Sequence, residues 1–125
     1  MRDGHADAVV LPESIQDVSE ILASANRDGT PVTVSGAGTG TVGGRVAFGG
    51  IVLATDKLNR IKSVETKGYA IAEAGVVLSD FQQAVEREGM LYPPDPTERG
   101  CFLGGTVATN ASGARTFKYG PTRNY

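Results

Sequence analysis

Residues 35–50 read SGAGTGTVGGRVAFGG, and seven of these sixteen residues are glycine. Short apolar runs flank the stretch on both sides, Val-Thr-Val at 32–34 and Ile-Val-Leu-Ala at 51–54. Glycine loses more backbone freedom on folding than any other residue, so a glycine-rich connection is costly to order. We therefore expect a loop between two strands whose backbone comes close to something that a Cβ would obstruct.

Residues 38–43 match the pattern G-x-G-x-x-G, which in Rossmann domains joins a strand to a helix. That motif needs the helix to begin at once, with its N-terminus directed at a pyrophosphate. Here residues 45–50 lead directly into the next apolar run and leave no room for a crossover helix. The loop also lacks the Gly-Lys-Ser/Thr sequence that ends the P-loop of nucleoside triphosphatases. Two interpretations remain: a nest of backbone N–H groups that binds an anion, helped by Thr39 and Thr41, or a flexible glycine-rich hairpin.

The sequence before the loop predicts a β-α-β unit. An apolar run at 8–11 predicts a strand, and the residues that follow Ser14 place their apolar side chains on one helical face. Ser14 is a candidate N-cap, and Gly29 is well placed to end the helix. A second strand is predicted at 31–34, parallel to the first and joined to it by a right-handed crossover.

The sequence after the loop predicts a hairpin followed by a helix. Residues 60–64 and 69–74 predict strands, and the polar turn between them, which ends in Gly68, predicts antiparallel pairing. Apolar residues three and four positions apart then predict a second helix, with Ser79 as a candidate cap and Gly89 as a stop.

A second glycine-rich segment, YPPDPTERGCFLGGTVATNASGARTFKYG, covers residues 92–120 and shows little periodicity. Prolines on both sides of Asp95 fix the backbone and predict a stiff turn. Residues 104–113 combine glycine and other small residues with several hydrogen-bonding groups. A flat polar ligand would fit directly against such a surface.

Four motifs occur in order along the chain: PVTVSGAGTGTVGG, PPDPTE, GGTVATNASG and KYGPTRN. Through them the chain, from about Asp7 to its last residue, resembles the PCMH-type FAD-binding domain of the FAD-linked oxidases. This family includes glycolate oxidase flavoprotein subunits and D-lactate dehydrogenases, within the vanillyl-alcohol oxidase type of flavoproteins. The resemblance implies an α+β fold in which two lobes hold FAD between them. Residues 1–125 are expected to form the first α/β lobe and the start of the second, in a domain truncated at its C-terminus.

Carried over by position, the resemblance also implies which residues bind the cofactor. Those of the first lobe form the pyrophosphate loop, Gly36, Ala37, Gly38, Thr39 and Gly40. Those of the second lobe line the rest of the dinucleotide and the flavin: Asp95, Thr109, Asn110, Ser112 and Gly113. Many relatives hold FAD covalently through a histidine of the pyrophosphate loop. The matching residue here is Thr39, so the resemblance implies noncovalent FAD.

The resemblance implies an FAD-dependent oxidoreductase that acts on the CH–OH group of a 2-hydroxy acid of the D-lactate or glycolate type. Its electrons would pass to an acceptor or to an iron–sulfur partner subunit. In the family a separate substrate domain supplies the base, so no catalytic residue is assigned and the chain alone is expected to be inactive. Two alternatives stay open: another flavoenzyme of this type, such as an alkyl-glycerone-phosphate synthase or a cell-wall enolpyruvyl reductase, and a non-catalytic module that binds a nucleotide or an anion.

Composition argues against several other classes. The 125 residues carry a formal net charge of −2 with interspersed acidic and basic residues, which offers no field for nucleic acid. Cys101 is the only cysteine, so no internal disulfide or thiolate metal cluster is expected, and its thiol should be buried as a small apolar group. The sequence shows neither a signal peptide nor a membrane span, which favours the cytoplasm.

Single aromatic and basic residues are expected to have structural roles. Tyr69, Phe81 and Phe102 should pack in the core or between lobes, because apolar aromatic side chains are usually buried. Arg45 and Arg115 should be solvated, because no spacing selects them as phosphate ligands.

Overall fold

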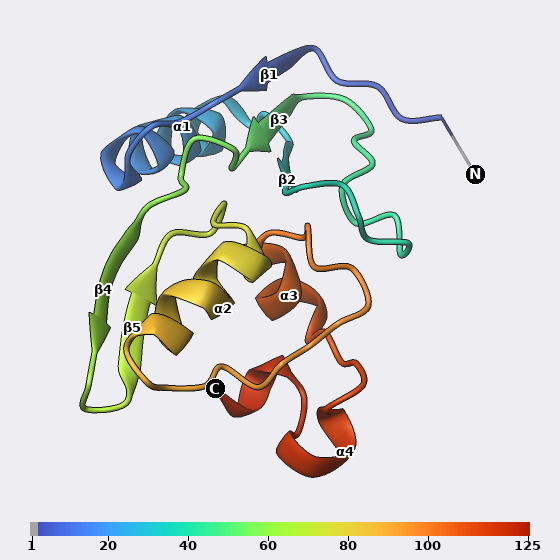
Figure 1. Ribbon diagram of the computed structural model, residues 1–125. Coiled ribbons are helices and arrows are strands. Elements are labelled where there is room, and N and C mark those ends of the chain that lie inside the picture. Colours follow the sequence, from blue (N-terminus) through green and yellow to red (C-terminus); the bar gives the residue numbers. More distant parts are fainter. Residues whose placement is uncertain (1–2) are drawn as a thin grey trace.

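The computed structural model describes residues 3–125, which form two lobes, one above the other in Figure 1. The first lobe contains β1 (Ala8–Val10), α1 (Ile15–Asp28), β2 (Val32–Ser35) and β3 (Ile51–Ala54). The second contains β4 (Ile61–Glu65), β5 (Tyr69–Ala72), α2 (Leu78–Arg87), α3 (Leu103–Thr109), α4 (Thr116–Tyr119) and a 3₁₀ turn, η1 (Thr122–Asn124). The predicted α+β class, with an α/β first lobe, is confirmed.

The first lobe is built on a parallel sheet with the strand order β1-β3-β2. In its central strand, Val52 pairs with Val9 on one side and with Thr33 on the other. The predicted β-α-β unit is present, but its two strands are not neighbours because β3 lies between them. The glycine-rich stretch therefore runs from the carboxyl end of β2 back to the amino end of β3.

α1 begins at its predicted cap and ends at Gly29, whereas α2 ends at Arg87 with Glu88 as its C-cap, directly before the predicted Gly89. The Ser14 hydroxyl accepts a hydrogen bond from the Asp17 N–H at 3.1 Å, and the Asp17 carboxylate accepts one from the Ser14 N–H at 3.0 Å. The Glu13 N–H also donates to this carboxylate and, together with Ser14, lowers the pKa of Asp17. Gly29 and Gly89 follow α1 and α2 with left-handed φ angles of 66° and 73°.

The second lobe packs α2 onto the β4–β5 hairpin, which is antiparallel as predicted. Its buried centre is covered by partly buried apolar residues of the hairpin and of the segment after α2; the centre consists of Val76, Phe81 and Val85. Phe81 therefore packs as predicted. Tyr69 does not, because Ala70 and Ala72 take the inward positions of β5 and leave Tyr69 on the outer face, 55% exposed.

The start of α2 differs from the prediction. Its N-cap is Val77, and Ser79 lies within the first turn without capping the helix. The Leu78 N–H donates to the Cys101 carbonyl at 2.9 Å, and the Ser79 N–H donates to the Arg99 carbonyl at 3.3 Å. These bonds satisfy first-turn donors that a capping side chain would otherwise serve.

A helix, α3, forms where the sequence showed little periodicity. The Leu103 N–H donates to the Val76 carbonyl and the Gly104 N–H to the Ala74 carbonyl, both at 2.8 Å. The start of α3 is thus anchored on the β5–α2 connection by backbone groups. Cys101, just before it, is buried as predicted.

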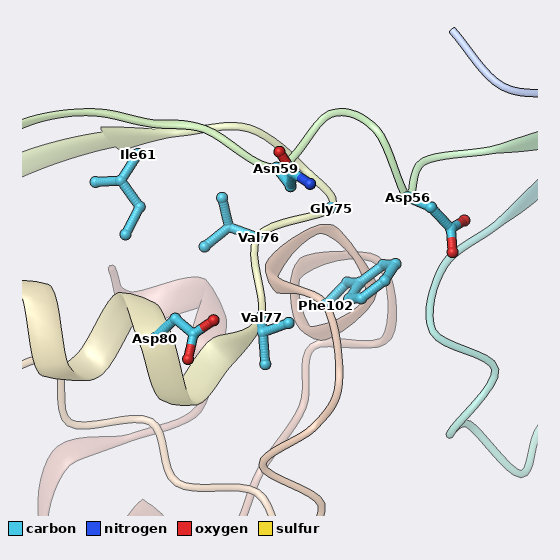
Figure 2. Close-up of a pocket in the computed structure, with 8 residues that line it drawn as sticks. All are labelled: Asp56, Asn59, Ile61, Gly75, Val76, Val77, Asp80 and Phe102. Carbon is cyan, nitrogen blue, oxygen red and sulfur yellow. The ribbon is translucent and has the colours of Figure 1, made fainter. Parts of the chain in front are cut away.

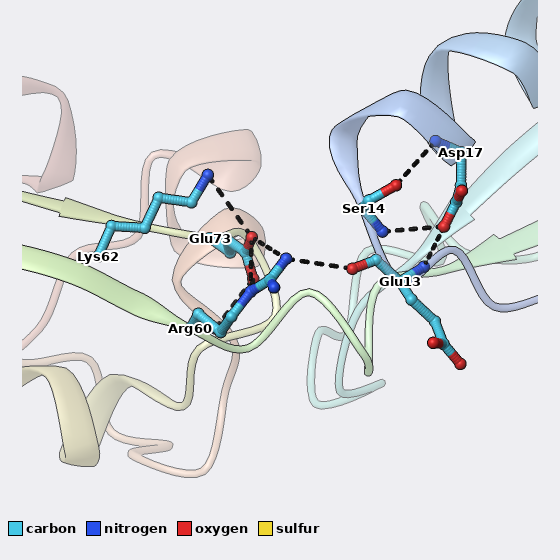
Figure 3. A network of polar contacts seen from close by, with 6 residues as sticks. All are labelled: Glu13, Ser14, Asp17, Arg60, Lys62 and Glu73. Carbon is cyan, nitrogen blue, oxygen red and sulfur yellow. Dashed lines mark hydrogen bonds and ion pairs between the residues drawn. The ribbon is translucent and has the colours of Figure 1, made fainter.

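A polar network joins the two lobes (Figure 3). The Glu73 carboxylate, only 5% exposed, accepts hydrogen bonds from the Arg60 guanidinium at 3.0–3.2 Å and from the Arg60 N–H at 3.0 Å. Lys62 lies 3.6 Å from the same carboxylate. Arg60, foremost through its side-chain hydrogen bonds, lowers the pKa of Glu73 to about 2. The same guanidinium donates to the Glu13 carbonyl oxygen before α1, so it ties the hairpin to the first lobe.

Candidate cofactor site

The glycine-rich loop covers residues 36–50 and contains no helix, which confirms that it is not a Rossmann motif. Its return to the sheet is fixed at Gly50, whose N–H donates to the Asp7 carboxylate at 2.9 Å. A Cβ on Gly50 would overlap the carbonyl oxygen of Pro31, so the end of the loop passes too close to the start of β2 for a larger residue. This glycine therefore serves the fold of the loop.

The N–H groups of residues 37–45 are available to a ligand. Among residues 3–125, none of them donates a hydrogen bond; the first donor after this stretch is Val46, which bonds to the Gly43 carbonyl at 3.0 Å. Gly38 has a left-handed φ of 78°, a conformation that helps successive N–H groups to converge on one side. Ala37, Thr39 and Gly40 around it are exposed. The loop thus has the donors and the access that an anion-binding nest requires.

Arg45 lies over this part of the loop. Its side chain is exposed, as predicted, but it folds back so that the guanidinium occupies the space that a Cβ of Gly38 would need. The same side chain borders an open pocket of about 350 Å³, together with Ser35, Val46 and their neighbours. Within residues 3–125 the guanidinium forms no ion pair. Sequence reasoning missed this placement, because a single cation carries no spacing signal.

The second lobe reaches the glycine loop through Phe102. The position of a Cβ on Gly36 would lie 3.7 Å from Cδ2 of Phe102. Phe102 precedes α3 and is held by an isolated antiparallel bridge to Val77. The start of the loop and the start of α3 therefore meet at the junction of the lobes.

Asp95 and Gly113, two of the predicted second-lobe residues, are in contact. A Cβ on Gly113 would overlap the Asp95 carbonyl, so the loop after α3 lies directly on the proline-rich segment. The Asp95 carboxylate, 11% exposed, pairs with Arg99 at 3.1 Å and with Arg115 at 3.5 Å. Arg115 is therefore paired and not merely solvated, because a nearly buried carboxylate needs a cationic partner. Asp95 holds two segments together through its side chain.

The remaining predicted residues lie at the end of α3. The Thr109 hydroxyl donates to the Gly105 carbonyl at 2.9 Å. Asn110 ends the helix with a left-handed φ of 49°, and its side-chain oxygen accepts a hydrogen bond from the Arg123 N–H at 3.0 Å. Ser112 is exposed. The ten predicted residues thus form two groups, one on the glycine loop of the first lobe and one on the second lobe.

An open pocket of about 620 Å³ lies at the junction of the lobes. Figure 2 shows its lining, which includes Asp56 after β3, Asp80 on α2 and Phe102 before α3. The connections after β3 and β5 touch here, since a Cβ on Gly75 would overlap the Thr55 carbonyl. None of the ten predicted residues lines this pocket. Most of its residues come from connections between elements, where no pattern in the sequence marked them; Ile61 of β4 and Asp80 of α2 are the exceptions.

Among residues 3–125, no group of three or more His, Cys, Asp or Glu side chains is placed to hold a metal ion. The helices of that same part of the chain are all too short or too polar to cross a membrane.

Comparison with a solved structure identifies the fold. Alkyldihydroxyacetonephosphate synthase matches with a TM-score of 0.83 and 23% identity, over 93% of this chain and 23% of that one. This likeness confirms the PCMH-type α+β architecture. The chain belongs to the FAD binding domain family, whose model matches residues 6–125.

Several curated relatives are more similar in sequence to this chain than the solved structure is. The D-lactate dehydrogenases of Anaerostipes hadrus and Archaeoglobus fulgidus are 43% and 42% identical over 98% and 94% of this chain. The glycolate oxidase subunit GlcD of Bacillus subtilis is 35% identical over 95% of it. The chain spans about a quarter of the length of these relatives, 26%, 27% and 26%. The matches confirm the predicted FAD-linked oxidase family and FAD as its cofactor.

The residues present fit the diphosphate of FAD. Bound diphosphate needs several hydrogen-bond donors and close approach of the backbone. The loop offers the unengaged N–H groups of residues 37–45, and Gly38 has no side chain to block them. Arg45 adds a positive charge beside the same backbone. The donor set therefore suits an anionic group at the place where the family resemblance implied one.

Proposed function

We propose that the chain is the FAD-binding part of an FAD-dependent oxidoreductase that oxidises a 2-hydroxy acid of the D-lactate or glycolate type. The observation that carries the proposal is the loop between β2 and β3, where the N–H groups of residues 37–45 have no acceptor among residues 3–125. The substrate class is supported by the D-lactate dehydrogenase and glycolate oxidase relatives, which are 35–43% identical to this chain.

In this proposal the first lobe holds the diphosphate. The backbone of residues 36–40 donates hydrogen bonds to its oxygens, and the exposed Thr39 hydroxyl adds one more donor. Thr39 has no ring nitrogen that could bond to the flavin, so FAD is held noncovalently. Binding then depends on hydrogen bonds, charge and the contact between the lobes.

The second lobe faces the rest of the dinucleotide and the flavin. The residues assigned to this role are Asp95, Thr109, Asn110, Ser112 and Gly113. Asp95 has a positioning role, because its ion pairs with Arg99 and Arg115 hold the proline-rich segment in place. The small side chains of residues 109–113 let a flat ring system approach the backbone. This lobe thus orients the cofactor relative to the loop.

Bound FAD supplies two-electron redox chemistry: two electrons and two protons leave the CH–OH group, which becomes a carbonyl group, and FAD is reduced. About three quarters of each relative's length lies outside the match, and the proposal assigns the base and the substrate contacts to that remainder. The electrons then pass to an acceptor or an iron–sulfur partner subunit. We further propose a cytoplasmic location, the compartment that the sequence analysis favours.

Thermal unfolding with separate ligands tests the cofactor assignment. FAD should raise the Tm of the chain more than ADP does, and ADP more than inorganic diphosphate, because each adds contacts to the folded state. Equal shifts with FAD and ADP would favour a nucleotide-binding module without a flavin site. No shift with any of the three would contradict the proposed cofactor site.

Flavin absorbance tests the substrate class in the whole protein that carries this chain. With FAD bound and oxygen removed, D-lactate or glycolate should bleach the blue absorption band. The chain of residues 1–125 alone should bind FAD without this bleaching. A whole protein that binds FAD but is bleached by no 2-hydroxy acid would contradict the substrate class and leave the cofactor site intact.

A further inference from the structure

Arg45 differs from the other cations of the chain in its position; several others, Lys67 among them, also form no ion pair within residues 3–125. Arg45 is the only charged residue between Asp28 and Asp56, a stretch that includes the whole glycine loop. Arg60 and Arg99 each face a carboxylate, at 3.0 and 3.1 Å. Arg45 faces none among residues 3–125 and instead lies on the backbone of Gly38. A guanidinium placed against unengaged N–H groups creates a site with a positive charge and no counter-charge.

From this placement we infer that Arg45 binds the FAD diphosphate and determines the selectivity of the site for diphosphate-containing flavins. The inference rests on the proposed function, in which the glycine loop holds that group. Backbone N–H groups supply dipoles but no net charge, whereas the diphosphate is anionic. The planar guanidinium donates two parallel hydrogen bonds to phosphate oxygens, and such charge-assisted pairs are about twice as strong as neutral ones.

Gly38 makes this position possible. A side chain at residue 38 would occupy the volume that the guanidinium takes, so the missing Cβ keeps Arg45 next to the nest. The turn closed by the Val46 N–H and the Gly43 carbonyl brings the chain back at this point. Arg45 therefore contacts the same anion as the backbone around Gly38. A flavin without a diphosphate, such as riboflavin, gains nothing from this charge.

The inference is tested with Arg45→Ala and Arg45→Lys, and with Lys67→Ala as a control. Lys67 lies in the turn of the β4–β5 hairpin, so its removal changes the net charge equally but in the second lobe and outside the glycine loop. Dissociation constants for FAD and for riboflavin are measured at low and high salt by flavin fluorescence. Phosphorus NMR of bound FAD reports on the diphosphate directly, and circular dichroism establishes that each variant is folded.

Arg45→Ala should weaken FAD binding about tenfold or more, the loss expected for a hydrogen bond to a charged group. Riboflavin binding should not change, the salt dependence of FAD binding should decrease, and the phosphorus resonances should shift. Arg45→Lys should recover part of the affinity, and Lys67→Ala should match the unsubstituted chain. Equal FAD affinity of the unsubstituted chain and Arg45→Ala would overturn the inference alone, as would an equal loss of FAD and riboflavin binding. Failure of the unsubstituted chain to bind FAD would overturn both this inference and the proposed function.

Discussion

Gly38 combines two constraints within the glycine loop. Its φ of 78° lies in the left-handed region, which costs an L-residue about 1–2 kcal/mol. Its Cβ position is also filled by the Arg45 guanidinium. Backbone conformation and the placement of the nearby charge are thus set at one residue.

Gly38→Ala should lower the free energy of unfolding by about 1–2 kcal/mol and weaken FAD binding, because it strains the backbone and displaces Arg45. Gly44→Ala is the matched control, since no atom lies within 4 Å of its Cβ position. That variant should change stability by no more than about 0.5 kcal/mol. Urea unfolding and FAD titration measure both effects. Equal behaviour of the two variants would support the flexible hairpin that the sequence left open.

Individual site residues could be predicted only where the sequence carries a pattern. An excess of glycine is visible without coordinates, so the loop around Gly38 could be located from the sequence. The placement of Arg45 could not be predicted, because it depends on how the arginine side chain folds back over Gly38. Arg115 was missed for a similar reason, since its partner Asp95 lies twenty positions away.

At the scale of elements, α3 shows how backbone contacts override weak local preference. Two adjacent glycines, Gly104 and Gly105, lie in its first turn, and glycine is a poor helix former. The helix forms because its first N–H groups bond to the Val76 and Ala74 carbonyls. These contacts are distant in sequence, so periodicity alone did not reveal the helix.

Replacing the two glycines of α3 by alanine, one at a time, should change the stability of the chain in opposite directions. Gly104→Ala places a Cβ 2.8 Å from the Ala74 Cβ and should destabilise the chain by about 1–3 kcal/mol. Gly105→Ala meets open space and should stabilise it by about 0.5–1 kcal/mol, because alanine favours the helix. Chemical denaturation of both variants provides the comparison. A loss of stability in Gly105→Ala would contradict the described packing of α3.

The strand order was another feature that local patterns could not give. Local sequence patterns were enough to predict β1, α1 and β2, including the Ser14 cap. The insertion of β3 between β1 and β2 depends on the path of the returning loop. The first turn of α2 likewise depends on the Cys101 and Arg99 carbonyls and not on its own Ser79.

At the scale of the whole molecule, the Glu73 network connects the lobes that would hold FAD between them. Glu73 orients Arg60, and Arg60 reaches the Glu13 carbonyl at 3.2 Å. Folding lowers the pKa of Glu73 from its ordinary value of 4.5 to about 2. The ionised carboxylate therefore adds stability that is fully present above pH 4.5 and is lost as the pH falls through about 2.

Glu73→Gln should lower the Tm at neutral pH, because it removes the charge that Arg60 and Lys62 face. The difference in Tm from the unsubstituted chain should stay constant above about pH 5 and shrink as the pH falls toward 2, because the carboxylate is then protonated in the unfolded chain before it is protonated in the native one. Thermal unfolding monitored by circular dichroism from neutral to acidic pH measures this. Glu88→Gln, an exposed carboxylate after α2, serves as the control. A difference that does not vary with pH would show that Glu73 acts by packing alone.

Equilibrium dialysis against FAD tests the central claim most directly, namely that the glycine loop and the second lobe together bind this cofactor. The protein compartment should hold an excess of FAD, seen in its near-ultraviolet and blue absorption. Inorganic diphosphate should reduce the excess by competing for the N–H groups of residues 37–45. Equal FAD concentrations in both compartments, with the chain folded, would contradict the account.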